Sequence, residues 1–292
     1  MRPGVVATLL AALLWGTSFP AIDLGLAHVH PLAFAALRFA LALAVLLALA
    51  AAVGRMRPGL FASRRVIVLG LLVAGSFLSQ FLAQTLTTPG KTALFVNLSV
   101  FPIAALAYAM YGEALGRRLG PAVALAGVGA VLVATGGRLE TLHGGTLAGD
   151  ALALASGLFW AFFAVGAKPL FAREGAIETI VPVFAWALAV LAPVAVASGA
   201  PAPAGLAAWA AVGYVGFLCT AAAFALWAHG MPAVGAAASA VMLVAEIVVA
   251  LAISLALGLE RLSPATALGA GLVLAGVGLA SLTGSRTADS RP

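Results

Sequence analysis

The side chains that could do chemistry in this chain are few, and most of them are embedded in long apolar runs. Glu246 lies about 13 residues into one such run, roughly 20 Å along a helix, and Ser239 and Met242 share its helical face. A carboxyl group at that depth could take up a proton or bind a cation. A protonated, hydrogen-bonded structural glutamate fits the sequence equally well.

Asp23 and Arg38 form a second charged set. They lie at similar depths near the ends of two successive apolar runs, on opposite sides of one short loop. Antiparallel helices would bring them to the same level, so we predict a structural intramembrane ion pair, with substrate contact as the alternative.

Three amides add uncharged donors and acceptors. Ser76, Gln80 and Gln84 recur every four residues on one helical face, and Asn97 follows in the next run. These amides could bind a polar solute. They could equally form hydrogen bonds between helices, which contribute about 0.6 kcal/mol each on average.

Aromatic side chains recur at helical spacing and could stack on a planar solute. The candidates for substrate binding among them are Trp15, Phe19, Trp160, Phe163 and Trp227. Lipid-facing or interfacial rings are the alternative for most of them. Trp15 and Trp160 fit that alternative less well, because each lies in the middle of its run.

The elements that position these residues are membrane-spanning helices. The chain of 292 residues is 64% hydrophobic and 8% charged, with a mean hydropathy of +1.16. Soluble domains carry about 25% charged residues. Strand-like alternation is absent, so we predict an all-α integral membrane protein.

Ten runs are long enough to cross a bilayer, for which a helix needs roughly 20 apolar residues. The predicted spans are roughly 5–27, 31–53, 66–87, 92–111, 119–137, 148–168, 177–198, 205–228, 233–258 and 264–284. With a cytoplasmic N-terminus, eleven Lys and Arg residues fall in cytoplasmic segments and three in outer segments. This bias predicts that both termini are cytoplasmic. It also explains the basic pI of about 10.4 without nucleic-acid binding.

The chain contains an internal repeat. Trp15 and Trp160 are 145 residues apart, Glu113 and Glu260 are 147 apart, and the pentapeptide Leu-Ala-Gly-Val-Gly recurs at 125–129 and 274–278. An odd number of spans per copy inverts the second copy, so we predict two inverted five-helix repeats. The units would be 1–137 and 148–284, with a linker loop at 138–147 and a cytoplasmic tail at 285–292. Glu113 and Glu260 would then lie at opposite membrane faces, where they would cap a helix or hold the next helical hairpin in place.

These landmarks resemble the drug/metabolite transporter superfamily, EamA type. The resemblance rests on Trp15-Gly16, Arg38, Pro102 with Glu113, and their second-half counterparts Trp160, Ala245-Glu246 and Glu260-Arg261-Leu262. It implies ten helices around a central cavity and transport of small metabolites. The family's ninth-span motif commonly reads Glu-Pro, whereas this chain has Glu246-Ile247. A proline hinge is therefore not expected there, but Pro102 could kink the fourth span.

We therefore expect a secondary-active transporter, and specifically an exporter, of amino acids or related polar or aromatic solutes. It would work by alternating access, with the substrate among the residues above and with Glu246 coupling transport to protons or another ion. A lipid or lipophilic-drug flippase with a laterally open cavity is the alternative. Enzyme motifs and a nucleotide-binding P-loop are absent from the sequence, and we expect no cofactor and no metal. The expected setting is a bacterial inner membrane, with the protein a monomer or weak homodimer.

Overall fold

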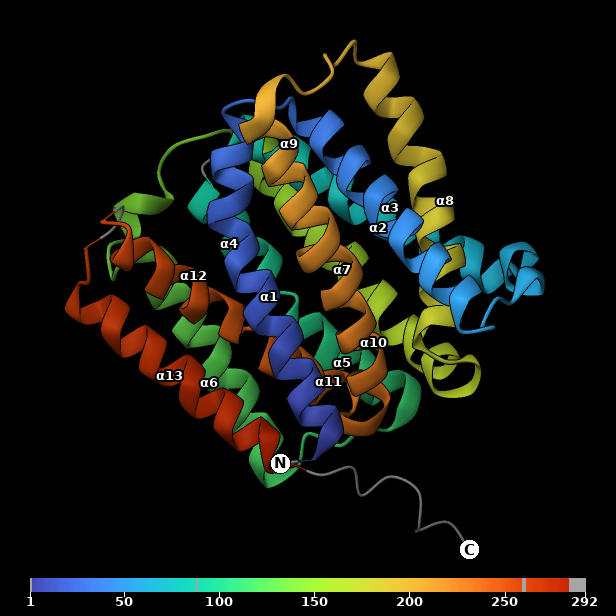
Figure 1. Ribbon diagram of the computed structural model, residues 1–292. Coiled ribbons are helices and arrows are strands. Elements are labelled where there is room, and N and C mark those ends of the chain that lie inside the picture. The colour runs from blue at the N-terminus through green and yellow to red at the C-terminus, as the bar shows by residue number, and fades with distance from the viewer. Residues whose placement is uncertain (1, 88, 259–260, 284–292) are drawn as a thin grey trace, which may run out of the picture.

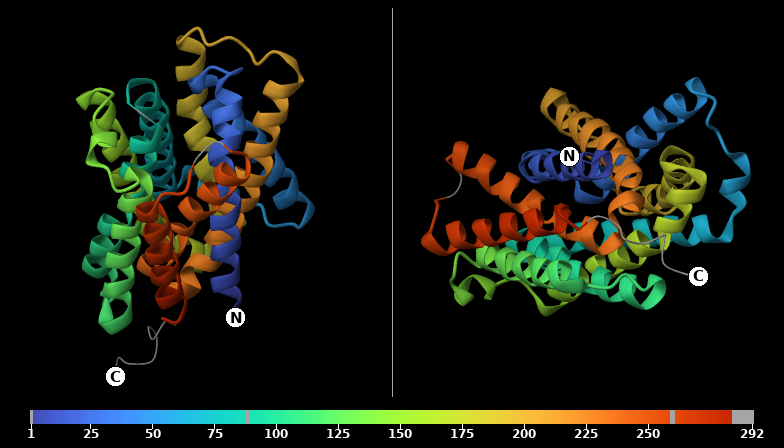
Figure 2. Two further views of the ribbon diagram at one scale, coloured as in Figure 1. Left: turned by 90° about the vertical axis from the view of Figure 1, so that its left-hand side faces the viewer. Right: turned by 90° about the horizontal axis from the view of Figure 1, so that it is seen from below.

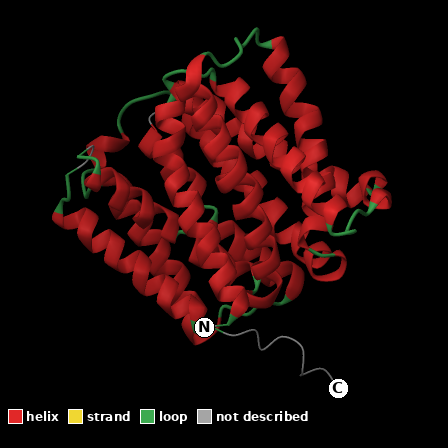
Figure 3. Cartoon of the chain, in the orientation of Figure 1, coloured by secondary structure: helices red, strands yellow, loops and turns green. Residues whose placement is uncertain are grey.

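The computed structural model describes residues 2–87, 89–258 and 261–283, and this part of the chain consists of helices and loops (Figure 3). Ten of its helical spans are long and apolar enough to cross a membrane. The predicted all-α architecture with ten spans is therefore confirmed. Glu260 and the predicted tail at 285–292 lie outside the described residues.

Seven spans are single helices and three are interrupted. The uninterrupted spans are α1 (Pro3–Leu26), α2 (Pro31–Ala52), α3 (Arg64–Leu86), α6 (Gly116–Thr135), α7 (Leu147–Glu174), α8 (Ala176–Ala197) and α13 (Pro264–Ser281). The fourth span consists of α4 (Pro89–Asn97) and α5 (Val100–Tyr111). The eighth consists of α9 (Gly205–Tyr214), the π-helical segment η3 (Val215–Ala222) and α10 (Ala223–Val234). The ninth consists of α11 (Ala236–Leu243) and α12 (Ala245–Ala256). Short 3₁₀ helices, η1 (Pro58–Ala62) and η2 (Leu139–Leu142), lie in two loops.

The sixth span is longer than the sequence predicts. Helix α7 continues through Pro169 to Glu174, whereas we expected it to end at Lys168. A proline cannot donate to the carbonyl four residues earlier, which here is that of Val165. The Tyr111 hydroxyl donates to this carbonyl at 3.0 Å. A neighbouring span therefore satisfies the acceptor that the proline leaves open, and the helix can continue.

The fourth span breaks just before Pro102. Since Pro102 has no N–H for the Leu98 carbonyl, the N–H of Phe101 donates to that carbonyl instead, at 3.1 Å. The ninth span breaks at Val244 although it has no proline. There the N–H of Val244 donates to Val241 O at 3.2 Å, and the N–H of Ile247 donates to Val244 O at 3.1 Å. These hydrogen bonds join residues three apart instead of four, and they interrupt the α-helical pattern. Asn97 and Glu246 each lie beside one of the two breaks.

Long-range helix pairs hold the bundle together. Helix α6 packs along α13 at one edge of the molecule, α3 packs on α7, and α1 packs on α10 (Figures 1 and 2). The α6–α13 contact depends on glycine, because a Cβ at Gly129 would lie 2.6 Å from Gly269 O. Such backbone contact is a common way to pack helices in lipid. The remaining spans surround a central cavity.

Candidate functional site

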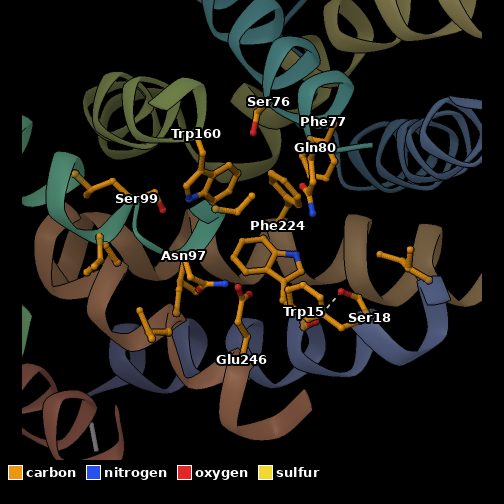
Figure 4. A pocket seen from close by; sticks show the side chains of 18 of the residues that line it. Trp15, Ser18, Ser76, Phe77, Gln80, Asn97, Ser99, Trp160, Phe224 and Glu246 are labelled. Atoms are coloured by element: carbon orange, nitrogen blue, oxygen red, sulfur yellow. Dashed lines mark hydrogen bonds between the residues drawn. The ribbon is translucent and has the colours of Figure 1, made fainter. Parts of the chain in front are cut away.

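The cavity lies at the centre of the bundle, where about 770 Å³ of space, open solvent included, is not filled by protein atoms. Its walls come from spans in both halves of the chain (Figure 4). The lining side chains are Trp15, Ser18, Phe19, Ile22, Arg38, Ser76, Phe77, Gln80, Val96, Asn97, Ser99, Val100, Ile103, Trp160, Phe224, Ala240, Leu243, Val244 and Glu246.

The Asn97 amide and the Glu246 carboxyl lie next to each other in the cavity lining (Figure 4). Asn97 ends α4 and Glu246 is the second residue of α12, so each lies at a break in its span. The Asn97 amide donates to Ala93 O at 3.0 Å, and it points toward the Glu246 carboxyl (Figure 4). Glu246 lies in the first turn of its helix, where exposed N–H groups favour a negative charge. The two helix breaks thus place an amide and a carboxyl in the same space.

Aromatic rings form one wall of the cavity. The rings of Trp15 and Trp160 meet edge to face with centroids 5.7 Å apart, and Phe224 lies 5.1 Å from Trp15 and 5.7 Å from Trp160. Trp15 is fixed by its indole N–H, which donates to Cys219 O at 2.8 Å. These two tryptophans therefore line the cavity instead of facing lipid.

A π-helical segment supplies the acceptors for this part of the wall. Arg38 Nε donates to Thr220 Oγ1 at 2.9 Å, and the Thr220 hydroxyl donates to Val215 O at 2.8 Å. The guanidinium also lies over the Phe77 ring, 5.0 Å from its centroid. Segments of π-helix leave backbone carbonyls available and frequently occur at functional sites.

The predicted Asp23–Arg38 ion pair is wrong. Arg38 is 3% exposed and turns toward η3, whereas Asp23 is exposed. Within the described residues, the ion pairs are Arg55–Glu178, Lys91–Asp150 and Lys168–Glu113. Equal depth along two helices does not make two side chains meet, because each helix also has a rotation about its axis. Arg38 instead lines the cavity.

Six of the ten predicted substrate-binding residues line the cavity: Trp15, Phe19, Gln80, Asn97, Trp160 and Glu246. The other four do not. Phe163 and Trp227 pack behind Trp160, with ring centroids 5.4 and 5.2 Å from it. Trp227 donates to Ser239 Oγ at 2.9 Å, and Met242 is fully buried. Gln84 Oε1 is buried away from the cavity, without a partner in the described part of the chain.

Several cavity residues were not among the predicted site residues, notably Phe77, Ser99 and Phe224. A signal existed for two of them, since Phe77 is three residues before Gln80 and Phe224 is three residues before Trp227, each pair sharing a helical face. Ser99 lies at the break of the fourth span, and no pattern in the sequence marks that break except the nearby Pro102.

Two ion pairs at or near the ends of spans lie away from the cavity. Lys91 donates to Asp150 Oδ2 at 2.6 Å and to Gly144 O at 3.0 Å, which ties the start of α4 to α7. Glu113 is ion-paired with Lys168, and its carboxylate accepts the N–H groups of Ala236 and Ala237 at 3.3 and 3.2 Å. Glu113 therefore caps α11, as a helix N-terminus favours.

Known proteins resemble this chain over almost its whole length. The model of the EamA-like transporter family matches twice, at residues 2–135 and 147–282. An uncharacterized transporter from Archaeoglobus fulgidus is 32% identical over 228 residues, which is 76% of this chain and 78% of that protein. One crystal structure of a protein has a TM-score of 0.79 at 26% identity, covering 96% of this chain and 97% of that chain. The family matches include every residue that lines the cavity.

Proposed function

Because this chain belongs to the EamA-like transporter family of the drug/metabolite transporter superfamily, we propose that it is a secondary-active transporter that works by alternating access. It is a multi-pass membrane protein with ten apolar spans. The proposed substrates are small metabolites such as amino acids or related polar or aromatic solutes, and the proposed direction is export.

The observation that carries this proposal is the cavity between two broken spans. Discontinuous helices at the interface of inverted repeats are where secondary transporters commonly bind substrate. Asn97 and Glu246 flank the breaks and are 149 residues apart, the same offset as the two Leu-Ala-Gly-Val-Gly segments. This shared offset supports the proposal that the fourth and ninth spans are repeat counterparts.

The pattern of helix packing supports the inverted repeat as well. In such a repeat, spans one to five correspond to spans six to ten. The contact of the first span with the eighth, α1 with α10, then corresponds to the contact of the sixth span with the third, α7 with α3, and both contacts are present. In the same way, the contact between α2 and η3 corresponds to the contact between α8 and α3. These matching contacts support the proposal that the two halves meet in a pseudo-twofold manner, with the cavity at their interface. Rocking the halves about that cavity would give alternating access.

Glu246 is the proposed coupling residue. It carries the carboxyl group of the cavity and lies beside a helix break, where a change in its charge would act on the hinge between α11 and α12. We propose that proton binding and release at Glu246 accompany each transport cycle. Ionisable residues within membrane spans form proton relays in many pumps and transporters.

Transport assays in proteoliposomes test both parts of this proposal. A panel of radiolabelled amino acids, amines and sugars is measured with and without an imposed pH gradient, for inward and outward flux. We expect at least one solute to move faster with the gradient. In Glu246→Gln the gradient should have no effect, while exchange of labelled for unlabelled solute continues at saturating solute concentration, because the cavity keeps its shape.

The matched control is Glu140→Gln, which makes the same chemical change at an exposed loop position. It should keep the full response to the gradient. If Glu246→Gln also keeps that response, Glu246 is not the coupling residue. If no solute moves in either direction with the wild-type protein, the transport proposal for this substrate range is refuted.

A further inference from the structure

Arg38 is a buried cation that uses little of its hydrogen-bonding capacity. A guanidinium has five N–H donors, and Arg38 Nε donates to Thr220 Oγ1 at 2.9 Å. Its second contact is the Phe77 ring, 5.0 Å away, which offers a π face and no acceptor atom. Within the described residues, the two terminal nitrogens of Arg38 have no acceptor.

These terminal nitrogens border the cavity. Arg38 is 3% exposed and belongs to the cavity lining. The fully enclosed side-chain atoms that lack a partner in the described part of the chain belong to Gln84, Glu178 and Thr179. The nitrogens of Arg38 are therefore not enclosed by protein, and they face the space where a solute would bind.

Arg38 also lacks a counter-ion among the residues that the structure describes. The ion pairs within the described residues involve other side chains. Among the described residues that line the cavity, Arg38 carries the guanidinium and Glu246 carries the carboxyl group. A cation within a membrane span is costly unless it has a partner or a function, and such residues commonly mark substrate pathways.

We propose that Arg38 binds the carboxylate of the transported solute, while Glu246 faces the solute's ammonium group. This inference rests on the proposed function and specifies its substrate class. The planar fork of a guanidinium matches a carboxylate with two parallel hydrogen bonds. Thr220 holds Nε, so the other side of the fork stays available to the cavity.

The charges in the cavity favour a carboxylate over a phosphate. One guanidinium and one carboxyl group sum to no net charge, which suits a zwitterion with one negative and one positive group. A dianionic phosphate would meet a single cation and the Glu246 carboxyl. The rings of Trp15, Trp160 and Phe224 would then contact the solute's side chain.

Ligand-induced thermal stabilisation of the purified full-length protein tests this assignment. L-phenylalanine is compared with L-phenylalaninamide, which lacks the carboxylate, and with 3-phenylpropionate, which lacks the ammonium group. L-leucine, L-leucinamide and 4-methylpentanoate form a second series, so that the choice of side chain does not decide the result. For wild type we expect the amino acid of at least one series to bind about tenfold or more tightly than both analogues.

The variants should separate the two ends of the solute. Arg38→Gln should remove the preference for the amino acid over the amide and keep its preference over the acid. Glu246→Gln should remove the preference for the amino acid over the acid and keep its preference over the amide. Arg38→Lys keeps the charge without the fork and should retain part of the carboxylate preference. If Arg38 or Glu246 had only a structural role, its replacement would lower the affinities for all three compounds together and would not remove one preference selectively.

The control is Arg57→Gln, an exposed arginine outside the spans, which should match wild type. Retention of the full carboxylate preference by Arg38→Gln would overturn the assignment. If Arg38→Gln fails to fold, loss of the preference in Thr220→Val, in which Arg38 loses its orienting partner, supports the assignment and an unchanged preference contradicts it. Absence of binding by both series would refute the amino-acid-like substrate, whereas uptake of another solute would leave the transporter proposal standing.

Discussion

Charged side chains inside the spans or next to them have two different environments. Lys91, Asp150, Glu113 and Lys168 are paired with one another at the ends of spans. Arg38 and Glu246 lie instead in the cavity lining, and Arg38 forms no ion pair with a described residue. Pairing compensates the desolvation of the first group. The second group lines the cavity, where we propose that it meets solute and protons. The environment of each charge therefore indicates whether its role is structural or functional.

Glu113 is the paired residue whose removal should cost most. Glu113→Gln leaves Lys168 without its counter-ion and replaces a charged acceptor at the start of α11 with a neutral amide. We expect a loss of about 3 kcal/mol in the free energy of unfolding, the lower end for breaking a buried ion pair. The lower end applies because the Lys168 side chain is 19% exposed. Unfolding in mixed detergent micelles measures it.

Two further variants make this result specific. Glu140→Gln is the exposed control and should unfold like wild type. The double variant Glu113→Gln/Lys168→Met should recover part of the loss, because it removes the unpaired cation. Equal stability of Glu113→Gln and wild type would mean that the pair and the cap contribute nothing to the fold.

At the scale of the elements, close helix packing and helix breaks have separate roles. The α6–α13 pair is joined by backbone contact at Gly129 and Gly269 and lies at the edge of the bundle. The breaks at Asn97 and Val244 lie beside the cavity. The packed pair thus gives the bundle a rigid edge, whereas the interrupted spans supply positions at which helices could bend.

Valine substitutions along α13 test the first role. A Cβ at Gly269 would lie 2.8 Å from Gly129 O and from Val133 N, whereas a Cβ at Gly271 would meet nothing within 4 Å. We expect Gly269→Val to lower the unfolding free energy by about 1–3 kcal/mol, the usual cost of overpacking. Gly271→Val, on the same helix, should change it little. Equal effects of the two substitutions would show that close packing of α6 on α13 is unimportant.

At the scale of the whole molecule, the distribution of charge predicts the orientation in the membrane. The loop between α2 and α3 contains Arg55 and Arg57, and Arg64 and Arg65 begin α3, whereas the loop between α8 and α9 contains no charged residue. The positive-inside rule predicts that the first of these loops is cytoplasmic and the second is on the outer side. The N-terminus would then be cytoplasmic.

Cysteine labelling in whole cells tests this orientation. Cys219 is fully buried and is the single cysteine, so Cys219→Ala provides a cysteine-free parent. In that parent, Ala202→Cys should react with a membrane-impermeant maleimide added outside. Arg57→Cys should react only after the membrane is permeabilised. The reverse labelling pattern would invert the predicted topology, and the unlabelled parent is the control.

Much of the architecture followed from the sequence alone. Hydropathy, together with the Gly, Pro and charged residues that separate the apolar runs, predicted the all-α class and the ten spans. Short motifs around Trp15, Arg38 and Glu246 indicated the transporter family. These features are local, because a bilayer requires a continuous apolar stretch in each span whatever its neighbours are. Six of the ten proposed binding residues do line the cavity.

Only the tertiary structure decided which side of each helix faces the cavity. Trp227 and Met242 are packed behind the cavity wall. Arg38 lines the cavity and does not pair with Asp23. Glu113 caps a helix of the other half of the chain. Helices in lipid are apolar on almost every face, since the lipid is as apolar as the protein core, so their sequence carries little of the amphipathic pattern that orients helices in water. The rotation of each span, and hence the composition of the site, is determined by packing against neighbours far away in the chain.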